Sequence, residues 1–445
     1  MDIGTSAEQM PLSRSMMRRI VFSSSIGNAL EWFDFLVYGY FAPIIAKVFF
    51  PVHDEWLSTL LAVGTFGISF LMRPLGAIVL GIYGDRHGRK AALTLAIALM
   101  MAGTLMMAGT LAMAVMPPYA SIGIAAPLLI LLARLVQGFA VGGEFGSATA
   151  LMVEHSPNRR GYFASWQFAS QGAAAILAAA FGSLLAWWLP PEQLQAWGWR
   201  LPFCFGLVLG PVGWYIRSHL DETPEFLANQ RAESMQAAPE GKAPGLGRQW
   251  GSLLLAVGIV AQSTVGVYIL QLYMPMYAVK QLHMAAASSF GVVVLNGGLQ
   301  FLLSPVMGAL SDRIGRVRIM LTTSILLATL TYPMFALLQR HPTLGWLLVL
   351  QAAAGIFKAA YSGPMPALMS EIFPVRVRSA GLSIAYSLGV TLFGGFAPTI
   401  AEVFIHASGD VLAPAYYVSL AAVISGVSLA VVGWRRRDRV GGRFR

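Results

Sequence analysis

Apolar residues occur along the chain in long runs, and short polar segments separate these runs. A run of about 20 apolar residues is long enough to cross the hydrocarbon core of a bilayer as a helix. A helix also pairs its own backbone polar groups, which lipid cannot do. We therefore predict twelve transmembrane helices, over residues 20–46, 56–82, 91–115, 123–153, 162–189, 199–217, 250–279, 287–311, 318–338, 344–370, 378–406 and 412–434.

One polar stretch interrupts this pattern near the middle of the chain. Residues 218–249 contain Pro224, Pro239, Pro244 and several charges, and they separate the sixth run from the seventh. Prolines and charges break helices and keep a segment in water. We therefore predict a six-helix bundle over residues 1–217, a cytoplasmic linker over 218–249, and a second six-helix bundle over 250–445.

The two predicted bundles carry similar motifs at equivalent places. GIYGDRHGRKAAL (81–93) follows the second run, and GALSDRIGRVRIM (308–320) follows the eighth. ALMVEHSPNRR (150–160) ends the fourth run, and ALMSEIFPVRV (367–377) ends the tenth. Two matches in the same order indicate an internal duplication, as in transporters built from repeats. The predicted fold class is an all-α integral membrane protein with twelve transmembrane helices in two pseudo-symmetric bundles.

The composition agrees with a membrane protein. Of the 445 residues, 56% are hydrophobic and 11% are charged, and the mean hydropathy is +0.65. Soluble domains contain about 25% charged residues. With a cytoplasmic N-terminus, 23 of the 30 Lys and Arg residues lie in cytoplasmic tails and loops, and only four lie on the opposite face. This positive-inside bias predicts cytoplasmic termini and explains the net charge of +10 without a nucleic-acid partner.

The three remaining cations, Arg73, Arg134 and Lys358, lie inside predicted transmembrane helices. A charge at the middle of a bilayer costs roughly 2.5–3.5 kcal/mol even on lenient insertion scales. Such residues therefore face the interior of a bundle, where they meet a carboxylate, a substrate or a proton pathway. These three cations are the first candidates for a functional site.

Several motifs resemble those of one transporter family over nearly the whole chain. Gly81, Asp85, Arg86, Gly88, Arg89 and Lys90 resemble the loop 2–3 motif of the major facilitator superfamily, and Gly308, Asp312, Arg313, Gly315 and Arg316 resemble its degenerate copy. RLVQG (134–138) resembles the fourth-helix motif of proton-coupled members. GNALEWFDFLVYGYFA, FLMRPLGAIVLG, GGEFG and LDETPEF resemble the metabolite–proton symporter family. GLSIAYSLGVTLFGGFAP (381–398) is most similar to the citrate and dicarboxylate branch, and the osmolyte branch often adds a C-terminal coiled coil that is not seen before Arg445.

The resemblance implies a conformational latch on the cytoplasmic side. In this family the loop motif contacts the opposite bundle and must release it during transport. The expected latch residues are Asp85, Arg86, Arg89, Asp312, Arg313, Glu154 and Glu371, with Asp312 and Arg313 forming the weaker second latch. The alternative is that the basic residues of these loops only set the membrane topology.

Three intramembrane acids are the candidates for proton coupling. Glu31 and Asp34 are three residues apart, so they share one face of the first helix, and Glu144 lies at a similar depth on the fourth. Burial opposes ionisation of a carboxyl group, whereas a nearby cation favours it. We expect these acids to carry the proton while Arg134 alternates between a carboxylate and the substrate. The alternative is that Arg73–Glu144 and Arg134–Asp34 are static structural pairs.

Lys358 is the most individual feature of the sequence. The fourth and tenth helices line the cavity in the resembled fold, and the family usually carries a small residue at this position. Lys358 therefore adds a cation to the wall opposite Arg134, where a multiply charged anion would meet one cation from each half. The alternative is a lysine that pairs with Tyr361 or reaches toward an interface.

Uncharged polar residues on the same helices could complete a pocket for an organic acid. The substrate-binding candidates are Arg134, Lys358, Arg73, Tyr38, Gln167, Gln171, Tyr268, Gln271, Asn296 and Tyr361, with Gln262, Tyr273 and Gln300 as further polar groups. Each could equally hold neighbouring helices together by hydrogen bonds.

The predicted function is import of an organic anion, a tri- or dicarboxylate such as citrate, together with protons by alternating access. The alternative is a proton-coupled importer of a zwitterion such as betaine or proline, which leaves Lys358 unexplained. No nucleotide-binding loop, metal-ligand spacing or nucleophile–base arrangement stands out, so we expect no enzyme activity and no cofactor. We expect a monomer in a bacterial inner membrane.

Overall fold

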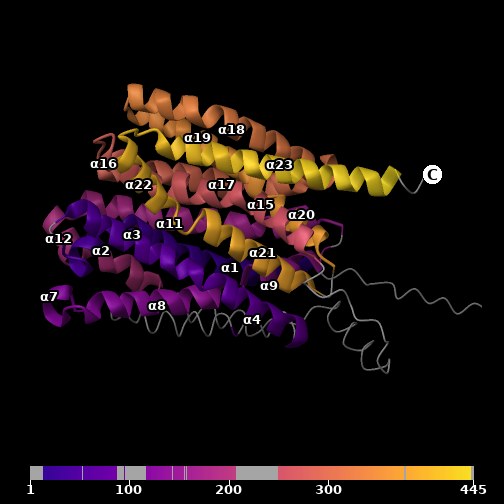
Figure 1. Cartoon of the computed structure of the whole chain (residues 1–445), viewed down its shortest axis with the longest axis horizontal. Coiled ribbons are helices and arrows are strands. Elements are labelled where there is room, and N and C mark those ends of the chain that lie inside the picture. Colours follow the sequence, from indigo (N-terminus) through magenta and orange to yellow (C-terminus); the bar gives the residue numbers. More distant parts are fainter. Residues whose placement is uncertain are drawn as a thin grey trace, which may run out of the picture.

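The computed structural model describes residues 14–52, 54–87, 95, 117–142, 144–154, 156, 158–206, 249–374 and 377–441. All regular secondary structure in these ranges is helical. The long helices lie side by side along the longest axis of the molecule, and the C-terminal helix ends at one end of the bundle (Figure 1). This confirms the predicted all-α class.

The helices of the earlier half, residues 14–206, are mostly broken into two pieces. They are α1 (Arg14–Tyr40), α2 (Ala42–Phe49), α3 (Glu55–Leu71), α4 (Arg73–His87), α7 (Tyr119–Ile122), α8 (Ala125–Gly142), α9 (Glu144–Glu154), α10 (Arg160–Ala164), α11 (Trp166–Trp188), α12 (Pro191–Ala196) and η1 (Gly198–Arg200). The Asp54 carboxylate caps α3 by accepting from the backbone N–H of Trp56 at 2.9 Å, which pairs a donor that the helix leaves free.

The later half, residues 249–441, contains longer helices. They are α15 (Trp250–Val267), the π-helical segment η3 (Tyr268–Tyr273), α16 (Met274–Lys280), α17 (Ala286–Ile314), α18 (Arg316–Arg340), α19 (Leu344–Ser362), α20 (Met365–Ile372), α21 (Arg378–Phe393), α22 (Ala397–Ser408) and α23 (Ala413–Gly441). Pro364 separates α19 from α20, and Gly394 and Gly395 separate α21 from α22, because neither residue type supports a continuous helix.

Nine helical stretches among the described residues are long and apolar enough to cross a membrane, and the bent pair α1–α2 makes a tenth. These ten correspond to the predicted runs one, two, four, five and seven to twelve. The third run (91–115) lies outside the described residues apart from residue 95, and the sixth is described only as far as Gly206. The linker 218–249 also lies outside them except for Gln249.

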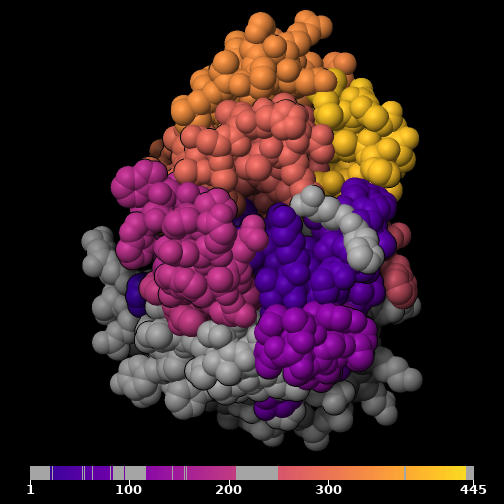
Figure 2. All heavy atoms as spheres, turned by 90° about the vertical axis from the view of Figure 1, so that its left-hand side faces the viewer, coloured from indigo at the N-terminus to yellow at the C-terminus, as the bar shows by residue number. Residues whose placement is uncertain are grey.

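The earlier and later halves meet along two helix pairs, α11 with α17 and α4 with α21. Viewed from the end of the bundle opposite the C-terminus, indigo and magenta segments of the earlier half lie against salmon and yellow segments of the later half (Figure 2). A Cβ atom added at Gly172 would lie 2.7 Å from the carbonyl oxygen of Gly297, and one at Gly297 would lie 2.8 Å from that of Gly172. The two backbones therefore approach closely only because both residues are glycine.

Candidate functional site

The earlier half holds a buried ion pair between α1 and α4. Arg73 begins α4 directly after the break at Met72, and its Nη2 lies 3.2 Å from Oε1 of Glu31. The Arg73 guanidinium also faces the rings of Phe35 and Phe70, 4.7 and 4.3 Å from their centroids. Arg73 is only 1% exposed, so its charge is compensated by a carboxylate and two aromatic faces.

Arg134 lies on α8 and is the second buried cation of this half, also 1% exposed. Its guanidinium stacks on Tyr38, 3.7 Å from the ring centroid, and its Nη1 donates to Oε1 of Gln137 at 2.7 Å. Among the described residues, Nη2 of Arg134 and Nε2 of Gln137 have no hydrogen-bond acceptor. Two donors of one guanidinium–amide unit are therefore available to a ligand.

The acids predicted to carry protons lie around these two cations. Asp34 is close enough to Arg134 for electrostatic attraction, but the two form no direct ion pair within the described chain. Glu31 pairs with Arg73, and Glu144 is buried within the fourth span, at the first residue of α9. The static Arg134–Asp34 pair that the sequence allowed is therefore not formed in this state.

The later half holds Lys358 in a network of amides. Lys358 lies on α19, is 8% exposed, and its Nζ donates to Oε1 of Gln271 at 2.5 Å. Nε2 of Gln271 lies 2.5 Å from Oδ1 of Asn296 and 2.8 Å from Oε1 of Gln300, and Asn296 donates to Gln351 at 2.7 Å. Gln271 belongs to the π-helical segment η3, a rare geometry that often occurs at functional sites.

Within the described chain, Lys358 has no carboxylate partner. Beside it is a cavity of about 20 Å³, lined by side chains of α15, η3, α17, α18 and α19 that include Gln262, Ser263, Asn296 and Ser362. That volume holds water but not an organic acid. The predicted organic acid would therefore need a larger space here than this structure contains.

One hydrogen bond joins this amide network to the earlier half. Nε2 of Gln300 donates to the backbone carbonyl of Phe168 on α11 at 2.7 Å. Gln300 lies on α17, so the bond crosses the α11–α17 contact. The surroundings of Lys358 are therefore connected to the opposite half through Gln271 and Gln300.

Some of the predicted polar residues hold helices together. Gln167 exchanges hydrogen bonds with Asn28 across α1 and α11, and the Tyr361 hydroxyl donates to the carbonyl of Ile259 at 2.7 Å. Tyr361 therefore does not pair with Lys358, although it lines the same cavity. The Tyr273 hydroxyl donates to Glu402. For these residues the interhelical alternative describes the contacts of this state.

Sequence analysis missed two groups at the centre. Tyr386 on α21 stacks on Phe145 at 3.7 Å between centroids and, with Tyr268, lies within electrostatic reach of Arg73 and Glu31. Gln137 was quoted only as a letter of the RLVQG motif, although it is the hydrogen-bond partner of Arg134. Both residues lay inside motifs already singled out, so their positions on the inward helix face could have identified them.

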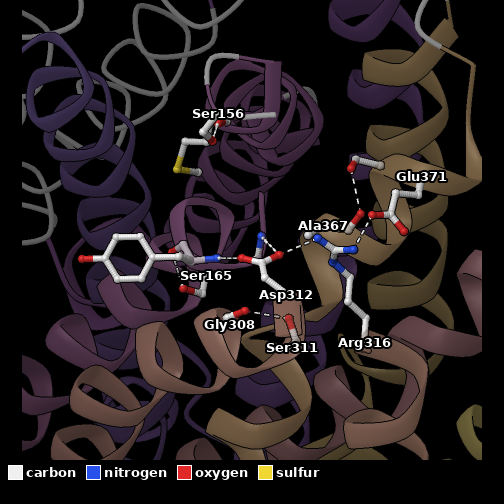
Figure 3. Close-up of polar contacts among 12 residues, drawn as sticks. Ser156, Ser165, Gly308, Ser311, Asp312, Arg316, Ala367 and Glu371 are labelled. Carbon is white, nitrogen blue, oxygen red and sulfur yellow. Dashed lines mark hydrogen bonds and ion pairs between the residues drawn. The ribbon is translucent and has the colours of Figure 1, made fainter. Parts of the chain in front are cut away.

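A polar network around Asp312, Arg316 and Glu371 joins the two halves (Figure 3). The Asp312 carboxylate accepts from the backbone N–H groups of Gly161 and Tyr162 at 2.9 and 3.1 Å. Arg316 lies 2.6 Å from Asp312 and 2.5 Å from Glu371. Asp312 thus binds a segment of the opposite half while Arg316 links it to α20.

The other predicted latch residues have different surroundings. Arg313 is exposed, and Arg316 instead forms the ion pairs. Glu154 lies 3.4 Å from Arg378 of the later half. Arg89 and the side chains of Asp85 and Arg86 lie outside the described residues. The described His, Cys, Asp and Glu residues include no group that could hold a metal ion.

Two family models match the chain. The model described as "Sugar (and other) transporter" matches residues 20–243, and the model "Major Facilitator Superfamily" matches residues 287–444. With buried charges at the centre of a helical bundle, these matches define a multi-pass membrane transporter and not an enzyme. The chain belongs to the major facilitator superfamily.

Its curated relatives transport two kinds of substrate. The citrate-proton symporter of Klebsiella pneumoniae is 37% identical over 398 residues, covering 89% of this chain and 87% of the relative. The proline/betaine transporter of Salmonella typhimurium is 36% identical, covering 93% of this chain and 83% of the relative. The alpha-ketoglutarate permease of Escherichia coli is 33% identical, covering 94% and 95%.

Solved structures show the same fold. The proton:xylose symporter XylE bound to 6-bromo-6-deoxy-D-glucose matches with a TM-score of 0.75 over 93% of this chain and 95% of that chain, at 15% sequence identity. At this identity the likeness concerns the fold alone. It confirms the predicted major facilitator architecture.

Proposed function

We propose that this protein is a proton-coupled symporter that imports an organic anion with two or three carboxylates, such as citrate. The observation that carries this proposal is the pair of unused donors at Nη2 of Arg134 and Nε2 of Gln137, both on buried side chains. A buried guanidinium with a free N–H group binds a carboxylate oxygen strongly, because charge-assisted hydrogen bonds are about twice as strong as neutral ones.

Asp34 provides a physical route to proton coupling. While the site is empty, Asp34 is the carboxylate that attracts Arg134. A substrate carboxylate bound to Arg134 would repel the ionised Asp34, so a proton from water would bind to Asp34 and leave the complex with one negative charge fewer. Glu31 and Glu144 are the other acids of this layer, and either could receive the same proton.

Lys358 favours substrates with more than one carboxylate. Among the described residues, its one side-chain hydrogen-bond partner is the neutral amide of Gln271, and a buried ammonium is stabilised more by a carboxylate than by an amide. We propose that one carboxylate binds near Arg134 and another near Lys358 when the bundle opens. A zwitterion such as betaine has only one carboxylate and would leave Lys358 bonded to Gln271.

The zwitterion alternative has one observation in its favour. Tyr268 of η3 lies against Trp32, Phe66 and Phe70 of the earlier half, with ring centroids 5.4 to 6.0 Å away. Aromatic rings around a site can bind a quaternary ammonium group by cation–π attraction. The proline/betaine relatives also support this alternative.

The transport cycle would exchange access between the two ends of the bundle. We propose that residues 1–217 and 250–445 form the two moving bundles, with the linker 218–249 and both termini in the cytoplasm of a bacterium. The Asp312–Arg316–Glu371 network would then close the cytoplasmic end, with Glu154, Asp85, Arg86 and Arg89 as further latch residues. The contacts of Asp312 with Gly161 and Tyr162 support this role.

Uptake into proteoliposomes under an imposed pH gradient tests the proposal. Labelled citrate should accumulate only when the outside is acidic, and 2-oxoglutarate and succinate should compete while betaine should not. Competition by betaine with no effect of the organic acids would support the zwitterion alternative. Citrate accumulation that is independent of the pH gradient would contradict proton coupling.

A further inference from the structure

A further buried carboxyl group, on α22, forms no ion pair with the cations described above. Glu402 on α22 is 6% exposed, and its Oε1 accepts a hydrogen bond from the Tyr273 hydroxyl at 3.0 Å. Tyr273 ends the π-helical segment η3, two residues after Gln271. In the described chain, Glu402 forms no ion pair with Lys or Arg, unlike Glu31, Glu154 and Glu371.

No charged side chain among the described residues compensates Glu402 from the elements around it. α22 packs against η3, α3 and α23. The titratable residues on these elements near this end are Tyr268, Tyr273, Tyr416 and Tyr417, and the side chain of Glu55 on α3 lies outside the described residues.

On α22 itself, His406 is exposed and stacks on Trp56 at 4.3 Å, and nearby Lys280 contacts Thr59 at 3.5 Å. Asp410 accepts from the backbone N–H of Leu412.

The helix α22, which carries Glu402, lies toward the end of the bundle that is opposite the C-terminus (Figure 1). It is six residues before the end of α22 at Ser408, which corresponds to about 9 Å along the helix axis. At the same end, the Trp56–His406 stack and the Lys280–Thr59 contact join the two halves. Glu402 is therefore within reach of water when this end opens and is buried when it closes.

An ionised carboxylate has about four acceptor positions, and Tyr273 fills one of them. Enclosing the ionised group with one neutral donor is costly, because buried charges need a partner or several hydrogen bonds. A proton taken from water onto Oε2 removes the charge, while the Tyr273 hydroxyl continues to donate to Oε1.

We propose that Glu402, positioned by Tyr273, is a proton-binding residue that must be protonated before this end of the transporter closes. The proposal rests on proton-coupled transport as the function, but it does not depend on which substrate is carried. The proposal adds a proton site in the later half to the acids around Arg134. Glu402 lies toward the side that is predicted to be extracellular.

The first test is counterflow with equal pH on both sides of the liposome membrane, measured over a series of pH values. A single required proton gives at most roughly a tenfold loss of rate per pH unit once the site is mostly ionised. Wild type should show a steeper decline than Glu402→Gln, which resembles the protonated acid and keeps only the pH dependence of the acids around Arg134. Asp410 is an acid at the same end but outside the span, so the counterflow rate of Asp410→Asn should decline with pH as in wild type.

Tyr273→Phe is the second variant, and it keeps the proton site but removes its donor. It should change the pH profile, because it removes the one hydrogen bond that the described chain provides to the Glu402 carboxyl group. A Glu402→Gln profile that matches wild type would overturn the proposal. So would Glu402→Gln protein that inserts and folds but has lost counterflow at every pH. If Glu402→Gln does not fold, an unchanged profile for Tyr273→Phe would overturn it.

Infrared difference spectroscopy on a pH step provides a measurement that needs no substrate. The wild-type protein in lipid should gain a protonated-carboxyl band on acidification, and part of that band should be missing in Glu402→Gln but present in Asp410→Asn. Identical bands in wild type and Glu402→Gln would contradict proton binding at Glu402. Failure of every carboxylate to be transported, with this band difference intact, would reject the anion proposal alone.

Discussion

The buried cations at the centres of the two halves have different partners. In the earlier half, Arg73 lies against Glu31 and Arg134 is attracted by Asp34, so each cation has an acid nearby. In the later half, Lys358 is held by the amide of Gln271 and has no acid partner in the described chain. Duplicated bundles with similar loop motifs have therefore diverged where their helices meet the centre.

We propose that this difference gives the two centres different tasks. A cation with an acid nearby can release that acid and bind a substrate carboxylate instead. The released acid then takes up a proton, which couples substrate binding to proton binding. A cation held only by amides gains most from an arriving anion, which is the chemistry of substrate selection. We therefore expect variants of the earlier centre to impair all transport and variants of the later centre to alter substrate preference.

The largest effect should come from Arg134→Lys, which keeps the charge but removes the planar guanidinium. Loss of one charge-assisted hydrogen bond, roughly 1.5–3 kcal/mol, corresponds to a fall in substrate affinity of about 10- to 150-fold. Counterflow at several substrate concentrations measures it, and Arg200→Lys outside the span is the matched control. Affinity within about twofold of wild type would remove Arg134 from the site.

Lys358→Gln should have a smaller and selective effect. Citrate affinity should fall about tenfold, since a charge-assisted contact becomes a neutral one, whereas any transport of betaine should be unchanged. Competition assays with both substrates measure the ratio, and exposed Lys47→Gln is the control. An equal loss for citrate and betaine would mean that Lys358 has a structural role and would end the contrast between the two centres.

Gln300→Leu tests whether the two centres are connected. It removes the donation to the Phe168 carbonyl across the halves and one acceptor of Gln271. We expect counterflow to fall about fivefold, as a lost buried hydrogen bond of roughly 1 kcal/mol implies. Gln351→Leu breaks the same network inside the later half only. Equal losses for the two variants would show that the cross-half bond has no particular role in transport.

The smallest predicted effect is at the end of the bundle nearest the C-terminus. Asp312→Asn weakens a partly exposed ion pair with Arg316, worth roughly 0.2–1 kcal/mol, and should shift the balance toward opening of this end by about 1.4- to fivefold. Distances between spin labels on both sides of the contact measure the shift. Arg316→Gln should act in the same direction and exposed Arg313→Gln should not. A larger shift in Arg313→Gln than in Arg316→Gln would instead identify Arg313 as the latch cation.

Apolar run lengths and the repeated motifs were enough to predict the fold, because span length and backbone pairing in lipid leave few alternatives. The buried positions of Arg73, Arg134 and Lys358 also followed from the cost of exposing charge to lipid. Partner choice did not follow. Arg73 pairs with Glu31 although the sequence suggested Glu144, since similar depth in the membrane does not determine which neighbouring helix a side chain faces.

The amide network around Lys358 was also beyond sequence reasoning. Gln271 reaches Lys358, Asn296 and Gln300 from a π-helical segment, where the usual helical spacing of side chains no longer holds. Arg316 was assigned to the repeated loop motif but not to the latch, because ion pairing with both Asp312 and Glu371 depends on how α18 begins against α20. Residue types were predictable at these places, but their contacts were not.

Equilibrium binding of labelled citrate to the purified protein tests the central claim most directly. The claim is that the unused donors of Arg134 and Gln137 receive a substrate carboxylate. Wild type should bind citrate saturably, and Arg134→Lys should weaken that binding at least about tenfold while Arg200→Lys leaves it unchanged. Citrate binding that is absent in wild type, or equal in wild type and Arg134→Lys, would contradict the account.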